Sequence, residues 1–469
     1  MDVITEIEQA NAIEKYLQKH FSDLERCSPY NENILQEFLK LGPFHSFIPR
    51  PLGGCGENSA SYLKTLETVS YYSLPLGLTM GITGSLFIMP IVKHAPSDLR
   101  NRIISEFLHG TPLGGIMITE PTGGTDIFGL QTSLSATQGG MLLNGAKCWG
   151  GLTGKAQHWL VAARKMQDGK LTRSLNLVYV PLSSPGIKVH TYFDALGLQP
   201  IPYGETRYSN VVVPEEHNLT PGGKGALRVL YDTLFRSRMN IPAIVSGLCK
   251  RLSEESAAWA SRRTVFGQSI DHYDQVQFRL SALRGFAQIN HCIRRFVGTW
   301  MDGHDDVSGD YVLVNSVKFV SSTTMAIAAD SAIHLFAASA YKRNHLVGRA
   351  YVDCRPFQIF EGSNDVLDDN TFSVLVGRYG RVTPEAISQE LEKFRLHMPS
   401  DLPKGVLDAL DVREEGSQRQ RVQYGRIIEW IVVRSLVEYI GADQKVPVED
   451  ARRVTNRYIA SCTAELAYL

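Results

Sequence analysis

The chain reads Met117-Ile118-Thr119-Glu120-Pro121-Thr122-Gly123-Gly124-Thr125-Asp126 where its texture changes, and this stretch decides the fold. Pro121 fixes its own φ and has no N–H to donate, whereas Gly123 and Gly124 tolerate positive φ and close approach to the backbone. Thr119 and Thr125 place a hydroxyl on either side. Such a turn can present N–H groups and hydroxyls to a phosphate or to the polar edge of a ring. Taken alone, it could equally be an ordinary Pro-Gly surface loop.

The composition is that of a globular chain with several domains. At 469 residues the chain is too long for one compact core, and two to four domains are expected. Lys plus Arg equals Asp plus Glu, at 48 each, so no nucleic-acid-binding surface is expected. The chain has no run of about 18 apolar residues and no secretory signal pattern near its first residue. We therefore expect no membrane span.

The cysteines predict neither a metal site nor a disulfide framework. They are Cys27, Cys55, Cys148, Cys249, Cys292, Cys354 and Cys462. Their number is odd, they are scattered, and no Cys-x-x-Cys occurs. This usage predicts a reducing, cytoplasmic location.

The pattern of apolar residues divides the chain into four parts. Residues 1–115 have helical spacing, and residues 116–222 alternate short apolar runs with turns, which indicates a small barrel or sandwich. Residues 223–380 return to long helical patterns, and residues 381–469 form a further helical tail. The runs expected to be strands are 141–144, 159–163, 175–180, 187–191 and 211–213.

Two apolar stripes are expected to face the core of the helical region. The first, rich in small residues, consists of Val314, Val317, Thr324, Ala328, Ser331 and Leu335. The second, in the tail, consists of Ile427, Ile428, Ile431, Val432 and Leu436. A stripe of this kind is more often bundle core than cofactor site.

Two later segments carry further polar residues at turns. Residues 263–268 read Arg-Thr-Val-Phe-Gly-Gln, and Gln275 follows shortly after. Arginine suits pyrophosphate because its planar guanidinium binds two oxygens at once. Residues 355–365 read Arg-Pro-Phe-Gln-Ile-Phe-Glu-Gly-Ser-Asn-Asp, in which Gly362 lets the backbone pass close to a flat ring. Each segment alone could be only a helix end, with Arg263 in solvent and Glu361 capping the next helix.

Together, in this order and at this spacing, the three segments resemble the acyl-CoA dehydrogenase family. The family's first segment has Gly-Ser-Asp after Thr-Glu-Pro, and here Thr125 stands in place of that Ser. The resemblance covers about four fifths of the chain and implies an α+β multi-domain fold. Its parts would be an N-terminal helical domain (1–115), a central small β-barrel or sandwich (116–222), a C-terminal four-helix-type bundle (223–380) and an additional helical extension (381–469).

The resemblance implies FAD as the cofactor and assigns residues to it by position. In the family, the residues that match Arg263 and Gln275 contact the FAD of a neighbouring subunit, so a homodimer or homotetramer is implied. Arg238 and Phe360 match positions near the substrate, and no metal is implied. The residues that match FAD-contacting positions are Met117, Ile118, Thr119, Gly124, Thr125, Trp149, Arg263, Phe266, Gln275, Gly362 and Ser363.

The resemblance also assigns the chemistry. Glu361 matches the family's catalytic base, which removes the α-proton of a saturated acyl thioester while flavin N5 accepts the β-hydride. The product would be the trans-2-enoyl thioester. A carboxylate held out of water beside the aromatic ring of Phe360 would be a stronger base. The sequence specifies neither the thioester carrier, coenzyme A or acyl carrier protein, nor the electron acceptor.

The chain departs from the family pattern at two places. Gly150 and Gly151 follow Trp149, so the hydroxyl that commonly bonds the reactive flavin nitrogen is missing unless Thr153 supplies it. Residues 337–340 read Ala-Ala-Ser-Ala where the family has a glycine-rich turn beneath the adenosine of FAD. Two alternatives therefore stay open: a flavin-dependent monooxygenase or oxidase on the same fold, and a non-catalytic flavin-fold binding protein.

Overall fold

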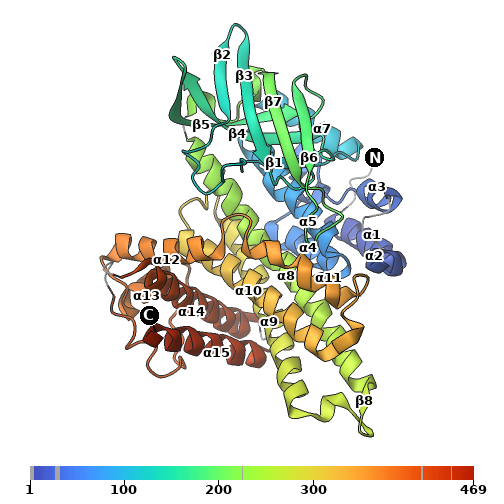
Figure 1. Cartoon of the computed structure of the whole chain (residues 1–469), viewed down its shortest axis with the longest axis vertical. Helices are drawn as coiled ribbons and strands as arrows, with labels where there is room; N and C mark the ends of the chain where they lie inside the picture. Colours follow the sequence, from blue (N-terminus) through green and yellow to red (C-terminus); the bar gives the residue numbers. More distant parts are fainter. Residues whose placement is uncertain (1–4, 27–31, 224, 413–415, 445, 469) are drawn as a thin grey trace. The chain divides into compact units, whose positions relative to one another are not determined.

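The chain forms two compact units in a computed structural model that describes residues 5–26, 32–223, 225–412, 416–444 and 446–468 (Figure 1). The first unit comprises Met1–Thr65 and Pro75–Ser237, and the second comprises Leu66–Leu74 and Arg238–Leu469. Three helices, α4 (Ser59–Tyr72), α5 (Leu74–Thr83) and α8 (Ala226–Arg262), contribute residues to both. The domain ends predicted at residues 115, 222 and 380 stay a prediction.

The N-terminal part of the chain is helical, as predicted. Helix α1 begins with a capping box in which the Thr5 hydroxyl accepts from the N–H of Glu8 and the Glu8 carboxylate accepts from the N–H of Thr5. Its companions are α2 (Phe21–Arg26), α3 (Glu32–Lys40), α5 (Leu74–Thr83), α6 (Met89–His94) and α7 (Ser97–His109), and α1 itself spans Glu6–Lys19.

The rest of the first unit is a curled seven-stranded sheet in the order β1-β4-β2-β3-β7-β6, with β5 paired to β4. The five strands predicted from apolar runs are confirmed as β3 (Gly140–Cys148), β4 (His158–Gln167), β5 (Lys170–Pro181), β6 (Ile187–Tyr192) and β7 (Gly204–Val213). Two short strands, β1 (Gly114–Met117) and β2 (Ser133–Thr137), were not predicted. Their sequences are rich in Gly and Ser, which are depleted in strands or neutral.

The edge of β4 sets the position of the turn that follows Met117. Strand β5 pairs antiparallel along one edge of β4, so β1 and β2, both parallel to β4, share the other edge. Met117 is the last residue of β1 and lies opposite Val161, whereas Ser133 begins β2 opposite Arg164. The chain between β1 and β2 therefore leaves the sheet edge and returns to it almost at the same place, which confines residues 118–132 to a compact turn.

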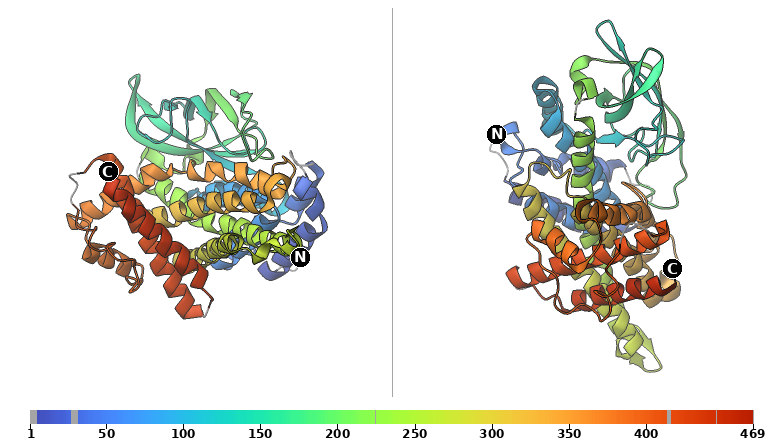
Figure 2. Two further views of the ribbon diagram at one scale, coloured as in Figure 1. Left: turned by 60° about the horizontal axis from the view of Figure 1, so that its bottom comes forward. Right: turned by 90° about the vertical axis from the view of Figure 1, so that its left-hand side faces the viewer.

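The second unit is a helical bundle to which the tail adds two long helices. Both predicted stripes are buried: that of α10 (Tyr311–Phe336) and that of α14 (Gln418–Gln444). Figures 1 and 2 show α14 and α15 side by side along the bundle, where α14 packs on α10 and α12. The remaining elements are α9 (Asp274–Gly303), α11 (Leu346–Asp353), α12 (Asn364–Tyr379), α13 (Pro384–Lys393), α15 (Glu449–Glu465), β8 (Thr264–Val265) and β9 (Gln268–Ser269).

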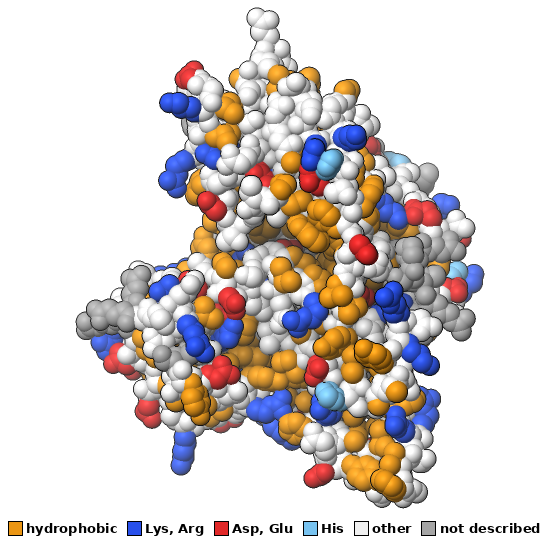
Figure 3. All heavy atoms as spheres, in the orientation of Figure 1, with side chains coloured by type: hydrophobic (Ala, Val, Ile, Leu, Met, Phe, Trp, Pro, Cys, Tyr) orange, Lys and Arg blue, Asp and Glu red, His pale blue; other side chains and the backbone are white. Residues whose placement is uncertain are grey.

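The protein surface carries both signs of charge (Figure 3), and the most apolar helical stretches lie inside the protein. Basic and acidic side chains are interspersed on the face that Figure 3 shows. Two helical stretches, Leu74–His94 and Tyr311–Ser339, are long and apolar enough to cross a membrane by composition, but 78% and 89% of their most apolar windows are buried in the protein. Core helices of globular proteins meet the same criterion.

The cysteines of the described residues are free. Five are buried and Cys462 is half-buried, whereas Cys27 lies outside the described residues. Among the described ranges, no cluster of three or more His, Cys, Asp or Glu side chains could hold a metal ion.

Candidate functional site

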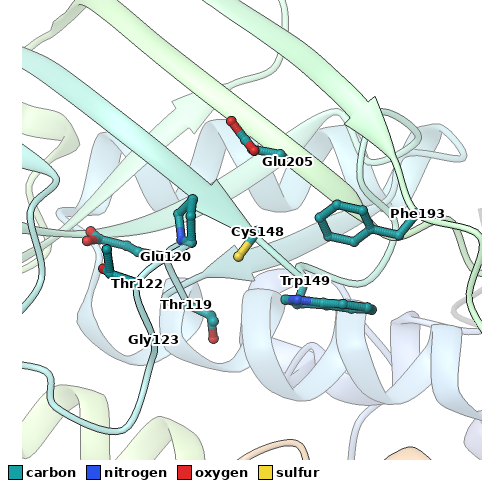
Figure 4. A pocket seen from close by; sticks show the side chains of 9 residues that line it. Thr119, Glu120, Thr122, Gly123, Cys148, Trp149, Phe193 and Glu205 are labelled. Carbon is teal, nitrogen blue, oxygen red and sulfur yellow. The ribbon is translucent and has the colours of Figure 1, made fainter.

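A pocket of about 450 Å³ opens in the first unit beside the turn that follows β1 (Figure 4). It is lined by Thr119, Glu120, Pro121, Thr122, Gly123, Cys148, Trp149, Phe193 and Glu205. Figure 4 shows the rings of Trp149 and Phe193 on one side, Glu120 and Thr122 on the other, and Cys148 between them. The pocket thus combines a flat aromatic wall with a polar turn.

A buried ion pair fixes this turn. Lys147 on β3 donates from Nζ to Glu120 Oε1 at 2.9 Å and to the carbonyl of Ile118 at 2.8 Å. Neither charged side chain is more than 3% exposed. Glu120 also accepts from the N–H groups of Gln131 and Thr132, at 2.5 and 2.8 Å. One carboxylate therefore joins both ends of the turn to β3.

The pKa values of both members of this pair lie below their ordinary values, for different reasons. Burial lowers the pKa of Lys147 to about 8, although the neighbouring Glu120 carboxylate opposes the shift. Burial alone would raise the pKa of Glu120, but Lys147 and the N–H of Gln131 outweigh it, and the pKa lies below its ordinary value. The carboxylate thus stays ionised inside the protein.

The two glycines of the turn have different structural reasons. Gly123 has φ +138°, in the range that favours glycine, and a Cβ there would meet nothing within 4 Å. A Cβ on Gly124 would lie 2.7 Å from Oγ1 of Thr119. Gly124 therefore leaves room for the Thr119 hydroxyl. Gly123 is required by its positive φ and faces open space. Thr125 is exposed beyond them.

Trp149 presents its indole to the pocket from an unusual backbone conformation. Its φ is +61°, and the side chain is 56% exposed with its ring centroid 4.5 Å from that of Phe193. Met117 is buried, and a Cβ on Gly150 would lie 2.5 Å from Met117 Sδ. Met117 therefore faces the core beneath Trp149, while the half-buried Ile118 is held through its carbonyl by Lys147.

The hydroxyl of Thr153 is committed to its own turn. Thr153 is fully buried, and Oγ1 donates to the carbonyl of Gly150 at 2.6 Å. In this conformation the hydroxyl points to the protein backbone rather than to the pocket. The residues after Trp149 thus offer no side-chain hydroxyl to a ligand of that pocket.

A second group of polar residues lies in the second unit, at the turn before α12. Glu361 and Gly362 both have positive φ, +56° and +98°. Arg238 on α8 donates from Nε to the carbonyl of Glu361 at 2.8 Å and from Nη1 to Oδ1 of Asn315 at 3.2 Å. A Cβ on Gly362 would lie 3.0 Å from Leu367 and 3.3 Å from Arg238. Arg238 thus holds the left-handed residue Glu361 by its main chain.

Lys318, on α10, lies beneath the same turn. Its side chain is fully buried, and Nζ donates to the carbonyl of Gly362 and to Oδ1 of Asn364, both at 2.8 Å. Burial lowers the pKa of Lys318 to about 7, and Arg238 adds to this shift while Glu361 opposes it. Two cations, Arg238 and Lys318, therefore grip successive carbonyls of one turn.

The other residues predicted for the site lie at three places. Half-buried Phe360 packs its ring 4.8 Å from that of Phe357, and Ser363 precedes α12 without a side-chain capping bond. Arg263, Phe266 and Gln275 lie at the other end of α8 and α9, around the β8 hairpin, which Figure 1 shows well away from α12. The second unit therefore does not bring these three together with Glu361.

Of residues 337–340, only Ala337 has a backbone conformation that favours glycine. Ala337 has φ +51° and ψ −134°, a region that non-glycine residues rarely adopt. It ends α10 and leads into a short 3-10 turn, Ala337–Ser339. The strain expected at this turn is therefore confined to Ala337.

Sequence reasoning missed Lys318, which supports the Glu361 turn, and the buried acid Glu429. Lys318 is the one lysine of α10, and its neighbours from Val312 to Ser322 are all buried. Glu429 is likewise a lone acid in the run Ile427, Ile428, Trp430 and Ile431. An ionisable residue inside an apolar stripe was the available signal, because such residues are rarely buried unless paired.

Comparison with known proteins identifies relatives over most of the chain. Three family models match: "Acyl-CoA dehydrogenase, N-terminal domain" at residues 8–111, "middle domain" at 115–211 and "C-terminal domain" at 223–371. A probable acyl-CoA dehydrogenase of Bacillus subtilis (strain 168) is 26% identical over 356 residues, which are 75% of this chain and 92% of that protein. The short-chain specific acyl-CoA dehydrogenase of Megasphaera elsdenii is 25% identical over 358 residues, with the same two coverages.

Solved structures share the fold at lower identity. The butyryl-CoA dehydrogenase of Megasphaera elsdenii aligns with a TM-score of 0.73 and 22% identity, over 80% of this chain and 98% of that one. The prolyl acyl carrier protein oxidase AnaB aligns with a TM-score of 0.72 and 19% identity, over 79% of this chain and 98% of that one. The family-model matches end at residue 371, before the helices α13, α14 and α15, of which α13 begins at Pro384.

Proposed function

Because the chain belongs to the acyl-CoA dehydrogenase family, whose members are FAD-dependent oxidoreductases acting on CH–CH bonds, we propose that it dehydrogenates a saturated acyl thioester. The product is the trans-2-enoyl thioester. Glu361 is the base that removes the α-proton, and the acyl carrier is coenzyme A or an acyl carrier protein.

The conformation of Glu361 is the observation that carries this proposal. A non-glycine residue at positive φ is uncommon and costs on the order of 1 kcal/mol or more, so it persists only where the surroundings enforce it. Here Arg238 bonds the carbonyl of Glu361, and Lys318 bonds that of Gly362. Two buried basic side chains that bond the main chain of one strained turn indicate that the Glu361 side chain must be held in a fixed orientation.

The pocket residues suit an isoalloxazine ring. The exposed indole of Trp149 offers a face for stacking, the open turn at Gly123 admits close approach, and Thr119 offers a hydroxyl. Met117 and Ile118 would act through their backbone, and Gly124 and Thr125 would complete the turn. Gly362 and Ser363 would contact the cofactor beside Glu361. FAD, when bound, supplies the two-electron acceptor that takes the β-hydride at N5.

The chain's own residues perform the proton chemistry. The Glu361 carboxylate accepts the α-proton as the α C–H bond breaks, and the released electron pair, delocalised onto the thioester carbonyl, becomes the Cα=Cβ bond when the β-hydride leaves. The backbone N–H of Glu361 donates to that carbonyl as negative charge develops there. Arg238, fixed beneath the turn, adds a positive field, to which Lys318 contributes while it is protonated. Phe360 and Arg238 border the acyl group.

Anaerobic titration of the purified protein with a panel of acyl thioesters tests the function. We expect a yellow protein whose flavin absorbance bleaches with at least one saturated acyl thioester and not with its 2-enoyl counterpart. Oxygen consumption by the reduced flavin, without any thioester requirement, would instead support a monooxygenase or oxidase. Colourless protein that takes up no FAD would support a non-catalytic binding protein.

The oxidase alternative has one observation in its favour. Gly151 has no hydroxyl, and that of Thr153 is bonded to the carbonyl of Gly150. The residues after Trp149 therefore offer no side-chain hydroxyl of the kind that commonly bonds the reactive flavin nitrogen in dehydrogenases of this family. The electron acceptor, an electron-transfer flavoprotein or oxygen, is decided by the same oxygen-consumption measurement.

Oligomeric assembly as a homodimer or homotetramer is part of the proposal. Phe266 is 97% exposed at the tip of the β8 hairpin, beside Arg263 and near exposed Gln275. Exposed aromatic and cationic groups at one tip suit contact with another subunit's FAD. Arg263→Ala should lower FAD content without unfolding the chain, and unchanged FAD content would contradict this role. A cytoplasmic location is likewise proposed.

A further inference from the structure

The C-terminal extension brings a buried acid into the bundle. Glu429 lies on α14, beyond residue 371 where the family match ends, and is fully buried next to Asp368 of α12, which is also fully buried. Thr371 Oγ1 donates to Glu429 Oε1 at 2.7 Å, and Arg426 Nε donates to Asp368 Oδ2 at 2.9 Å. Each carboxyl thus has one satisfied oxygen.

The second oxygens of Asp368 and Glu429 can bond each other only if one of the two carboxyl groups is protonated. Asp368 Oδ1 and Glu429 Oε2 are buried and have no hydrogen-bond partner among the described residues while both groups are ionised. Two carboxylates are acceptors only, so they can bond each other only when one carries a proton. Two adjacent buried negative charges are also strongly unfavourable.

We propose that Glu429 holds a proton that it donates to Asp368, and that through this bond the C-terminal extension positions the Glu361 turn. Glu429 is a positioning residue and does not touch the reacting atoms. Its effect on turnover rests on the function proposed above, whereas the shared proton does not.

The path from this pair to the turn is short. Asp368 lies one helical turn after Asn364, the first residue of α12, and Asn364 accepts from Lys318. Lys318 in turn bonds the carbonyl of Gly362. A shift of α12 caused by loss of the Glu429 bond would therefore displace the residues that follow Glu361.

The charges around the pair are consistent with one shared proton at neutral pH. Burial, with Asp368 as the next cause, raises the pKa of Glu429 well above its ordinary value, and burial raises that of Asp368 to about 6. Arg426 bonds both Asp368 and Asp365, Lys318 lies within electrostatic range on α10, and the Cys462 thiol faces the pair from α15. With one proton shared, the pair carries one negative charge and Asp365 a second. The positive charges of Arg426 and of protonated Lys318 offset these two.

Three variants of the full-length holoprotein test the proposal. Glu429→Gln keeps a side-chain N–H donor for Asp368 and an acceptor for Thr371, whereas Glu429→Leu removes both. Glu438→Gln, on the same helix and paired with Arg434 and Arg452, controls for general weakening of the extension. The readouts are the infrared band of a buried protonated carboxyl, hydrogen exchange of the backbone segment 361–364, and kcat with KM.

We expect the infrared band in the wild type and in Glu438→Gln but not in Glu429→Gln. Exchange at 361–364 should stay close to wild type in Glu429→Gln and be on the order of tenfold faster in Glu429→Leu, because a buried acceptor is left unsatisfied. In Glu429→Leu, kcat should fall while KM changes little.

Persistence of the band in Glu429→Gln would overturn the shared proton. Exchange at 361–364 that is no faster in Glu429→Leu than in Glu438→Gln would overturn the link to the turn. If Glu429→Leu does not fold, the band and the exchange of Glu429→Gln decide, since exchange tenfold faster in that variant would contradict the proposal. Both readouts remain decisive if no acyl thioester proves to be a substrate, so the two proposals can fail separately.

Discussion

Arg238 donates from Nε to the main-chain carbonyl of Glu361 at 2.8 Å, across 123 residues of sequence. The same guanidinium donates from Nη1 to Asn315 on α10. One planar group thereby joins α8, α10 and the turn before α12, which no single-point cation can do with the same geometry. The backbone of Glu361 is set by this bond rather than by its neighbours in sequence.

Replacement of Arg238 by Lys tests the importance of this fork. Lysine can make only one of the two bonds at a time, so the turn should loosen and kcat should fall on the order of tenfold, the effect of about 1.4 kcal/mol. FAD content per chain should be unchanged. Steady-state kinetics with the flavin spectrum of each preparation measure both quantities. Arg251→Lys, on the same helix and paired with Glu255, is the matched control; equal kcat in the two variants would refute the role of Arg238.

The buried pair Lys147–Glu120 predicts a stability defect that a second substitution relieves. Lys147→Met leaves the Glu120 carboxylate buried without its cation and should lower the free energy of unfolding by about 3–5 kcal/mol. Adding Glu120→Gln removes the stranded charge and keeps one acceptor oxygen, enough for the N–H of Gln131 or for that of Thr132 but not for both. Urea unfolding of the single and double variants makes the comparison. A double variant no more stable than Lys147→Met would show that charge burial is not the cause.

The sequence predicted helices, strands and turns better than it predicted which of them contact each other. The turn 117–126, five strands of the sheet and the stripes of α10 and α14 followed from local pattern and are confirmed. The parallel pairing of β1 and β2 along one edge of β4 depends on register between distant segments, which periodicity does not encode.

The same limit applies to the support of Glu361. Lys318 reaches Gly362 across 44 residues, and Thr371 reaches Glu429 across 58. Lys318 and Glu429 are each an ionisable residue in an apolar stretch of sequence. Only the packing of α10, α12 and α14 shows which residues they contact. The positive φ of Glu361 was not predicted either, because only the Gly that follows it marks the turn in sequence.

Ala337 predicts a stabilising substitution. Because its φ of +51° with ψ −134° is rare for residues with a Cβ, Ala337→Gly should raise the free energy of unfolding by about 1 kcal/mol. Ala338→Gly, one residue later in the 3-10 turn, should instead lower it by up to about 1 kcal/mol. Thermal or urea unfolding of the two variants provides the measurement. A loss of stability in Ala337→Gly would show that this backbone is not strained.

Burial of Lys318 predicts a specific pH dependence of stability. The folded pKa of about 7 lies below the ordinary value of 10.5, so between these values the folded protein binds fewer protons than the unfolded chain. The contribution of Lys318 to stability is therefore fully present above the ordinary value and is lost as pH falls towards 7. Relative to Lys318→Met, the wild type should gain up to about 1.4 kcal/mol per pH unit between pH 7 and 9.

Urea unfolding of both proteins at pH 6, 7, 8 and 9 measures this difference. Lys342→Met removes an exposed lysine and controls for loss of charge. A constant difference between wild type and Lys318→Met from pH 7 to 9 would mean that Lys318 keeps an ordinary proton affinity in the folded state.

The proposed reaction requires the Glu361 carboxyl to be the base that removes the α-proton. Its most direct test is an anaerobic spectrum of Glu361→Gln holoprotein mixed with the acyl thioester that bleaches the wild type. The amide keeps the size of the side chain and the backbone bond from Arg238 but cannot accept the α-proton. We predict a yellow protein whose flavin stays oxidised; bleaching at the wild-type rate would contradict the assignment.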